Sequence, residues 1–155
     1  TMIKFARERA DKQEIDNINF YQDGFLSYEY KGKPLDVIIT QLTLHHLPDF
    51  WKAIALKRMY EMLKSGGILY IYDVIYSFKI EDYEEVLNYW IDKEKEKTEE
   101  EIAKDIETHI KEEYSTFADV MEKLIKKAGF EIEKAEYDNE IFNTYLLKKK
   151  EGVKK

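Results

Sequence analysis

Two polar segments of the chain carry residue types that acid–base chemistry uses. His45 and His46 follow one apolar run, and Asp73 follows a second. A carboxylate or an imidazole at the end of an apolar strand can act as a general base or hold a substrate amine. For Asp73, a structural role as a helix cap or a surface acid is an equal alternative.

The histidines also have structural alternatives. His45 and His46 can shape the turn that precedes a helix, and we favour this role for His45 but leave both roles open for His46. Adjacent residues of an extended segment point to opposite sides, so we expect no metal site from this pair. His109 lies on an apolar stripe, where packing is favoured over a position above a substrate.

The segments that carry these residues have a β–α–β pattern. Apolar runs at 35–40 and 68–73 predict strands, and the helical spacing at 49–64 predicts the helix between them. Asp49 is the expected N-cap, and Ser65-Gly66-Gly67 is the expected end of the helix. Such a unit places the two strands side by side and parallel.

This topology predicts where a ligand binds. Open α/β sheets bind ligands beyond the carboxyl ends of their strands, which selects residues 40–47 and 73–78. The β-branched residues of 35–40 are typical of a strand that is covered on both faces. The other expected elements are helices at 2–13, 81–93, 98–112 and from Ser115 or Thr116 to Gly129, a strand at 17–21, and a hairpin of 130–137 with 140–148 that turns at Asp138-Asn139.

The composition limits the class of protein. The 155 residues, 44% of them hydrophobic, suit one domain with a packed core. The absence of Cys indicates an intracellular protein, which we expect to be cytoplasmic. The net charge of −7 argues against nucleic acid as a partner, and no apolar run is long enough to span a membrane.

Three motifs in order resemble the class I S-adenosylmethionine-dependent methyltransferases. They are LDVIIT at 35–40, LHHLPD at 44–49 and LKSGGIL at 63–69, similar to the family's fourth strand, the turn after it, and the approach to its fifth strand. The resemblance implies an α/β fold with a partial Rossmann-like sheet, parallel strands, a C-terminal antiparallel hairpin and helices on both faces. It further implies one domain over 1–155 that is incomplete at its N-terminus, with a helical lid insertion at 76–116.

The resemblance also implies a cofactor and its site. S-adenosylmethionine would lie against an adenine-contacting loop and the turn after the 35–40 strand. Tyr114 would be a lid residue, with ordinary packing as an equal alternative. The implied cofactor-binding residues are Asp23, Gly24, Phe25, Gln41, Leu42 and His46, and the implied catalytic residues are Asp73, His46 and Tyr114.

Two parts of the family's cofactor site have no counterpart in this sequence. They are the D/E-x-G-x-G-x-G loop and the acid that binds the ribose hydroxyls, so we expect the chain alone to bind the cofactor weakly or not at all. The function that the resemblance implies is methyl transfer to a small acceptor by the intact parent protein. The alternative is a non-catalytic domain that serves assembly or binding, and an uncovered strand edge favours a homodimer.

Overall fold

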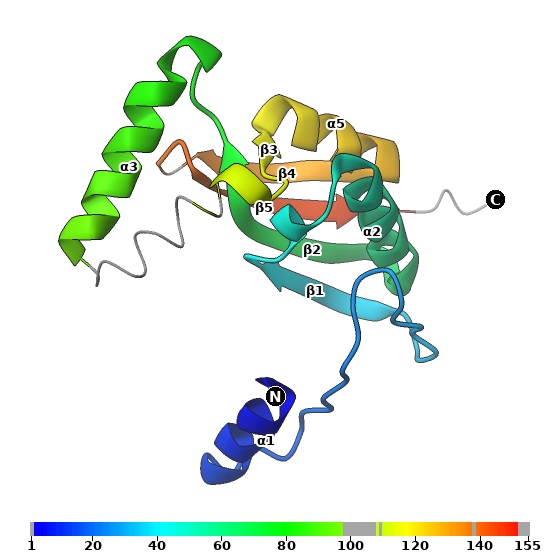
Figure 1. Ribbon diagram of the computed structural model, residues 1–155. Helices are drawn as coiled ribbons and strands as arrows, with labels where there is room; N and C mark the ends of the chain where they lie inside the picture. The colour runs from blue at the N-terminus through cyan, green and yellow to red at the C-terminus, as the bar shows by residue number, and fades with distance from the viewer. Residues whose placement is uncertain (1, 98–107, 109, 138, 152–155) are drawn as a thin grey trace. The chain divides into compact units, whose positions relative to one another are not determined.

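The computed structural model describes residues 2–97, 108, 110–137 and 139–151 (Figure 1). The chain divides into two compact units, Thr1–Lys31 and Gly32–Lys155, and each is described by itself. No helix in the described part of the chain is long and apolar enough to cross a membrane. The predictions of a single domain and of an insertion at 76–116 stay predictions.

The first unit contains the helix α1, Met2–Lys12, as its sequence spacing predicts. The strand predicted at 17–21 is wrong, because these residues have no regular secondary structure. The Arg7 guanidinium donates to the carbonyl of Phe20 at 3.1 Å, which ties this segment to α1. A lone extended segment has no neighbour to satisfy its backbone hydrogen bonds, so its apolar pattern alone does not make it a strand.

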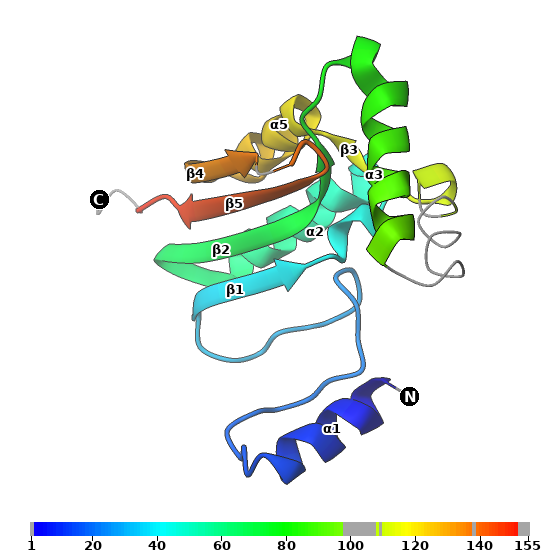
Figure 2. The same cartoon turned by 90° about the vertical axis from the view of Figure 1, so that its left-hand side faces the viewer.

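The second unit is an α/β fold built on one sheet, as predicted (Figures 1 and 2). Its strands lie in the order β1-β2-β5-β4, where β1 and β2 are parallel and β5 is antiparallel to both of its neighbours. The predicted parallel pair and C-terminal hairpin are therefore confirmed. The bounds are Leu35–Gln41 for β1, Leu63–Tyr76 for β2, Phe130–Tyr137 for β4 and Phe142–Lys149 for β5, with a short β3, Thr116–Phe117, that pairs parallel with the end of β2.

Helices connect these strands, with boundaries that differ in places from the prediction. Asp49 is the first residue of α2 and Pro48 is its N-cap, so the predicted cap is wrong by one residue. The N-cap of α5 is Phe117, which follows the predicted Ser115 or Thr116 and makes no side-chain cap hydrogen bond, so the predicted cap is wrong. The helical elements are η1, Leu44–His46; α2, Asp49–Met62; η2, Ile80–Asp82; α3, Tyr83–Lys97; and α5, Ala118–Ala128.

The turns at the ends of α5 and β4 follow the chemistry of their residues. Gly129 ends α5 with a left-handed φ of 109°, as predicted. The side-chain oxygen of Asn139 accepts hydrogen bonds from the backbone N–H groups of Ile141 and Phe142, which closes the hairpin turn. Asp138 lies outside the described residues, as do 98–107 and His109, on which most of the helix predicted at 98–112 depends.

The helices cover the sheet unequally. α2 and α5 pack on one face, where Leu56, Leu69 and Tyr145 are fully buried (Figure 2). On the other face α3 packs only near the carboxyl end of β2, through Trp90 among others. Val37 and Ile39 of β1 are 51% and 69% exposed, so the prediction that this strand is covered on both faces is wrong.

Candidate active site

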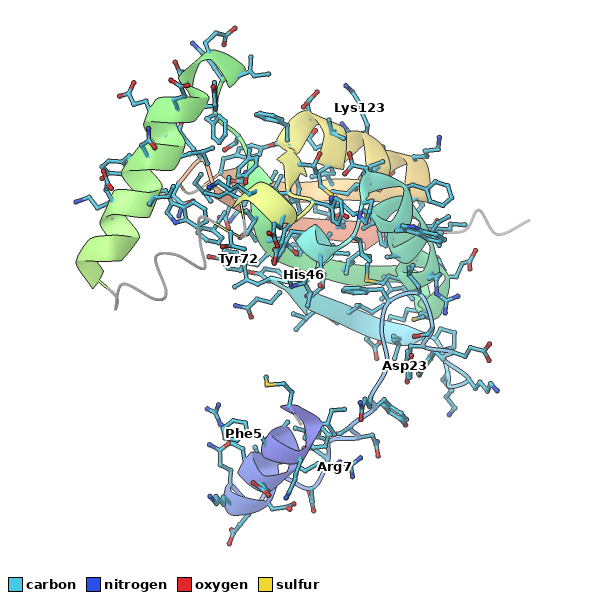
Figure 3. All side chains as sticks on the ribbon, viewed as in Figure 1. Phe5, Arg7, Asp23, His46, Tyr72 and Lys123 are labelled. Carbon is cyan, nitrogen blue, oxygen red and sulfur yellow. The ribbon has the colours of Figure 1, made fainter. Side chains whose placement is uncertain are left out.

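The carboxyl ends of β1 and β2 meet at one edge of the sheet, where the predicted site residues of the second unit gather. The backbone N–H of Leu42 donates to the carbonyl of Tyr72 at 2.8 Å, which joins the two strand ends. Leu42 has a left-handed φ of 48°, uncommon for a residue with a branched side chain. This turn directs the chain out of β1 and into η1. Gln41 and His46 are exposed there, and Figure 3 labels His46 beside the end of β1.

Asp73 organises the turn from beneath. It is 1% exposed, and one of its carboxylate oxygens accepts hydrogen bonds from the backbone N–H groups of Thr43 at 3.1 Å and Leu44 at 2.8 Å. Its other oxygen binds Nδ1 of His45 and the N–H of Val74. Neither a helix cap of the usual kind nor a surface acid describes it: Asp73 is a buried carboxylate that fixes η1.

The pKa of Asp73 reflects two opposed effects. Burial favours the neutral acid and by itself would raise the pKa of this carboxyl. The hydrogen bond and charge of His45, together with the N–H groups of Leu44 and Thr43, favour the carboxylate and bring the pKa below its usual value. A carboxyl that stays ionised well below neutral pH is a weak general base, so the geometry favours positioning over proton abstraction.

The two histidines do not point apart. Their ring centroids lie 4.2 Å from each other, because the residues belong to a 3-10 helix rather than to an extended segment. Nε2 of His45 lies 3.0 Å from one carboxylate oxygen of Glu113, and Nδ1 of His46 lies 3.2 Å from the other. The reason given for excluding a metal site is therefore wrong.

Tyr114 reaches the site through its backbone. Its N–H donates to the carbonyl of His45 at 2.9 Å, and its carbonyl accepts a hydrogen bond from the ammonium of Lys52. The same ammonium donates to Asp49 at 2.9 Å, although Lys52 is only 2% exposed. The side chain of Tyr114 is 52% exposed, so its predicted role above a substrate stays a prediction.

Two residues of the site, Lys52 and Glu113, were not predicted from the sequence. Lys52 precedes Ala55, Leu56 and Met59 at helical spacing, so a lysine on the apolar stripe of α2 was the available signal. Glu113 lies in an acidic stretch, and no feature of the sequence separates it from its neighbours.

The predicted adenine-contacting loop has its own local structure. The carboxylate of Asp23 accepts a hydrogen bond from the N–H of Gly24 at 3.0 Å and one from the hydroxyl of Ser27. These contacts shape a turn that contains Phe25, which is half-buried. The loop belongs to the first unit, so its approach to Gln41, Leu42 and His46 remains a prediction.

A cleft of about 830 Å³ opens between α3 and the β4–β5 turn. Val86, Trp90 and Phe142 supply its apolar part, and Glu85 and Lys93 supply charge. The rings of Trp90 and Phe142 meet edge to face with centroids 5.5 Å apart. Figures 1 and 2 show α3 near the end of the sheet toward which β1 and β2 run.

Comparison with known proteins identifies the family. The family model described as "Methyltransferase domain" matches residues 1–138. The chain therefore belongs to this methyltransferase-domain family, and its fold is that of the class I methyltransferases.

Curated relatives agree with this assignment. An uncharacterized methyltransferase of Geobacillus sp. (strain WCH70) is 26% identical over 126 residues, which are 81% of this chain and 55% of the relative. One from Bacillus cereus (strain ATCC 14579) is 26% identical over 131 residues, with coverage of 84% and 55%. The chain thus spans about half the length of these relatives.

Solved structures share the fold at low sequence identity. An O-methyltransferase family protein from Burkholderia thailandensis has a TM-score of 0.67 at 12% identity, over 97% of this chain and 41% of its own. The [4+2]-cyclase SpnF has a TM-score of 0.69 at 13% sequence identity, and the match covers 97% of this chain and 63% of the cyclase. A protein from Pyrococcus horikoshii has a TM-score of 0.61 at 17% sequence identity, and the match covers 96% of this chain and 67% of that protein. A cyclase among these structures means that the fold alone does not determine the reaction.

Proposed function

We propose that the chain forms the acceptor-side part of an S-adenosylmethionine-dependent methyltransferase that acts on a small molecule. The observation that carries this proposal is the ordered turn at the carboxyl ends of β1 and β2, held by the buried Asp73. That edge is where open α/β sheets bind ligands. Membership in a methyltransferase family gives the reaction class its support.

The residues at this edge fit part of the cofactor. Gln41 offers an amide and His46 an imidazole, and both side chains are exposed at the turn where the methionine end of the cofactor would lie. Leu42 gives an apolar surface, 39% exposed, beside them. The glycine-rich loop that would hold the rest of the cofactor has no counterpart in these 155 residues.

The chemistry asks little of the protein beyond positioning. Bound S-adenosylmethionine supplies a methyl group that its sulfonium already activates. Asp73 and His45 would hold the turn in place, so that an acceptor atom can be fixed in line with that methyl group. When no metal ion occupies its lone pair, His46 is the exposed candidate for taking a proton from an acceptor that must lose one.

The acceptor would enter from the side of α3. Its cleft combines apolar walls with the charges of Glu85 and Lys93, a pattern typical of a site for a small organic molecule. Trp90 is the largest residue of this wall. We infer that substrate choice depends on α3 and the β4–β5 turn.

A transfer assay on the full-length protein tests this function. The protein is incubated with S-adenosylmethionine carrying a labelled methyl group and with a set of small aromatic and aliphatic acceptors, and formation of S-adenosylhomocysteine is measured. We expect turnover with at least one acceptor. Failure of the full-length protein to bind S-adenosylmethionine would contradict the proposal and favour a non-catalytic domain that serves assembly.

A further inference from the structure

Three potential metal ligands converge beside the proposed site. They come from η1 and from the segment before β3: His45, His46 and Glu113, whose ligand atoms all lie within 4.8 Å of one another. The two nitrogen–oxygen separations of 3.0 and 3.2 Å are close to the separation of about 3.3 Å that ligands have around a tetrahedral Zn²⁺ at its usual bond lengths. The two contacts use different oxygens of Glu113, so an ion bound by all three residues would draw ligand atoms that now lie up to 4.8 Å apart closer together.

The buried Asp73 gives this cluster a feature of built metal sites. It faces Nδ1 of His45, and an ionised carboxylate can only accept a hydrogen bond, so Nδ1 carries the proton. In the neutral ring the lone pair is then on Nε2, the atom that faces Glu113. Metal-bound histidines commonly donate their other ring N–H to a carboxylate in this way, which orients the ring and raises its basicity.

The charges of the cluster also favour a cation. Nε2 of His45 and a carboxylate oxygen of Glu113 lie 3.0 Å apart, and both atoms offer lone pairs that a metal ion between them would bind. His45 is 3% exposed and Glu113 is 24% exposed, so an ion between them would be largely shielded from water and strongly attracted to the carboxylate.

We propose that His45, His46 and Glu113 bind one divalent transition-metal ion of the Zn²⁺ class. Two imidazole nitrogens and one carboxylate oxygen form a donor set that suits this class and leaves a fourth position open. The ion ties Glu113 to η1, next to the hydrogen bond between Tyr114 and His45. It thereby ties residues 110–115 to the ligand-binding edge of the sheet.

Calorimetric titration of the chelator-treated protein with Zn²⁺ tests the proposal, and Co²⁺ absorption reports the geometry. We expect one ion per chain, with the tetrahedral Co²⁺ spectrum. Replacing a ligand, in Glu113→Gln or His46→Ala, weakens binding by at least about tenfold, since even residues behind the ligands are worth that much. Glu112→Gln is the matched control, because Glu112 is exposed, adjacent, and outside the cluster.

Thermal unfolding provides the second readout. Zn²⁺ should raise the midpoint for the native protein and for Glu112→Gln, but not for His46→Ala, because a ligand stabilises only a fold that binds it. His46 is 54% exposed on its side chain, so its replacement leaves the metal-free fold intact. The proposal is overturned if the native protein binds no ion in a one-to-one ratio, or if Glu113→Gln and Glu112→Gln bind equally well. Neither result depends on methyl transfer.

Discussion

At the scale of single residues, the site depends on a buried carboxylate rather than on an exposed base. Asp73 makes hydrogen bonds to two backbone N–H groups of the turn and to His45, and none of these could be read from its place in the sequence. The sequence predicted Asp73 at the end of its strand, but β2 continues to Tyr76, so Asp73 lies inside the strand, three residues before its end. Its burial and its partners depend on contacts between segments about 30 residues apart.

Acid should destabilise the protein through Asp73. Its folded-state pKa is lowered, so the stability it contributes is present above the unfolded carboxyl pKa of about 3.9 and is lost as the pH falls below that value. At pH 7 we expect Asp73→Asn to reduce the free energy of unfolding by about 3 kcal/mol. Urea unfolding at several pH values measures this.

The difference between native protein and Asp73→Asn should shrink as the pH falls below about 4, because the carboxyl of the unfolded chain then binds its proton while that of the folded chain is still ionised. A constant difference between pH 7 and pH 3 would contradict the account of this pKa.

Lys52 should stabilise the fold out of proportion to an ordinary lysine. Its buried ammonium bonds both Asp49 and the carbonyl of Tyr114, and hydrogen bonds to charged groups are worth about 1.5–3 kcal/mol each. We expect Lys52→Ala to lower the free energy of unfolding by about 2–3 kcal/mol, as measured by chemical denaturation. Lys57→Ala is the control on the same helix, since its pair with Glu61 is exposed and worth less than about 1 kcal/mol. Equal losses in the two variants would refute the role of Lys52.

At the scale of elements, hydrophobic periodicity was sufficient to predict most of the helices and strands. The β1–α2–β2 unit and the C-terminal hairpin follow from local patterns and turn residues, and the structure confirms both. The strand predicted at 17–21 failed because strand formation needs a partner, which a local pattern does not reveal. The 3-10 conformation of η1 was also missed, and with it the approach of His45 to His46.

Gly129 should be needed to end α5. Its φ of 109° is strained for other residues, and an added Cβ would lie 3.1 Å from the ring of Tyr60. We expect Gly129→Ala to lower the unfolding midpoint, at a cost of more than about 1 kcal/mol. Gly24→Ala is the control, because its added Cβ meets nothing nearer than Ser27 at 3.7 Å. A neutral Gly129→Ala would mean that α5 ends differently.

Trp90 should affect the acceptor more than the fold. It forms one wall of the cleft beside α3 and is only half-buried. In the full-length protein we expect Trp90→Ala to raise KM for the acceptor about tenfold or more, which corresponds to the loss of a contact worth roughly 1.4 kcal/mol. KM for S-adenosylmethionine should change little. An equal change in KM for the acceptor and KM for S-adenosylmethionine would mean that the acceptor does not bind in this cleft.

At the scale of the whole molecule, the edge strand β1 carries exposed apolar side chains. Val37 and Ile39 are exposed on one face of β1, and apolar surface of this kind favours association. We expect the 155-residue chain to form a dimer or a larger species through β1, and Ile39→Lys to return it to a monomer in sedimentation experiments. A native chain that is monomeric at every concentration would contradict this prediction.

The central claim is that the carboxyl ends of β1 and β2 form part of an S-adenosylmethionine site. The most direct test is a titration of the 155-residue chain with S-adenosylmethionine, followed by amide NMR. We predict weak binding, far above micromolar dissociation constants, with shifts confined to Gln41, Leu42, His46 and their neighbours. Shifts centred on another part of the sheet, or none at saturating cofactor, would contradict the location of the site. Micromolar binding would contradict the claim that these 155 residues hold only part of it.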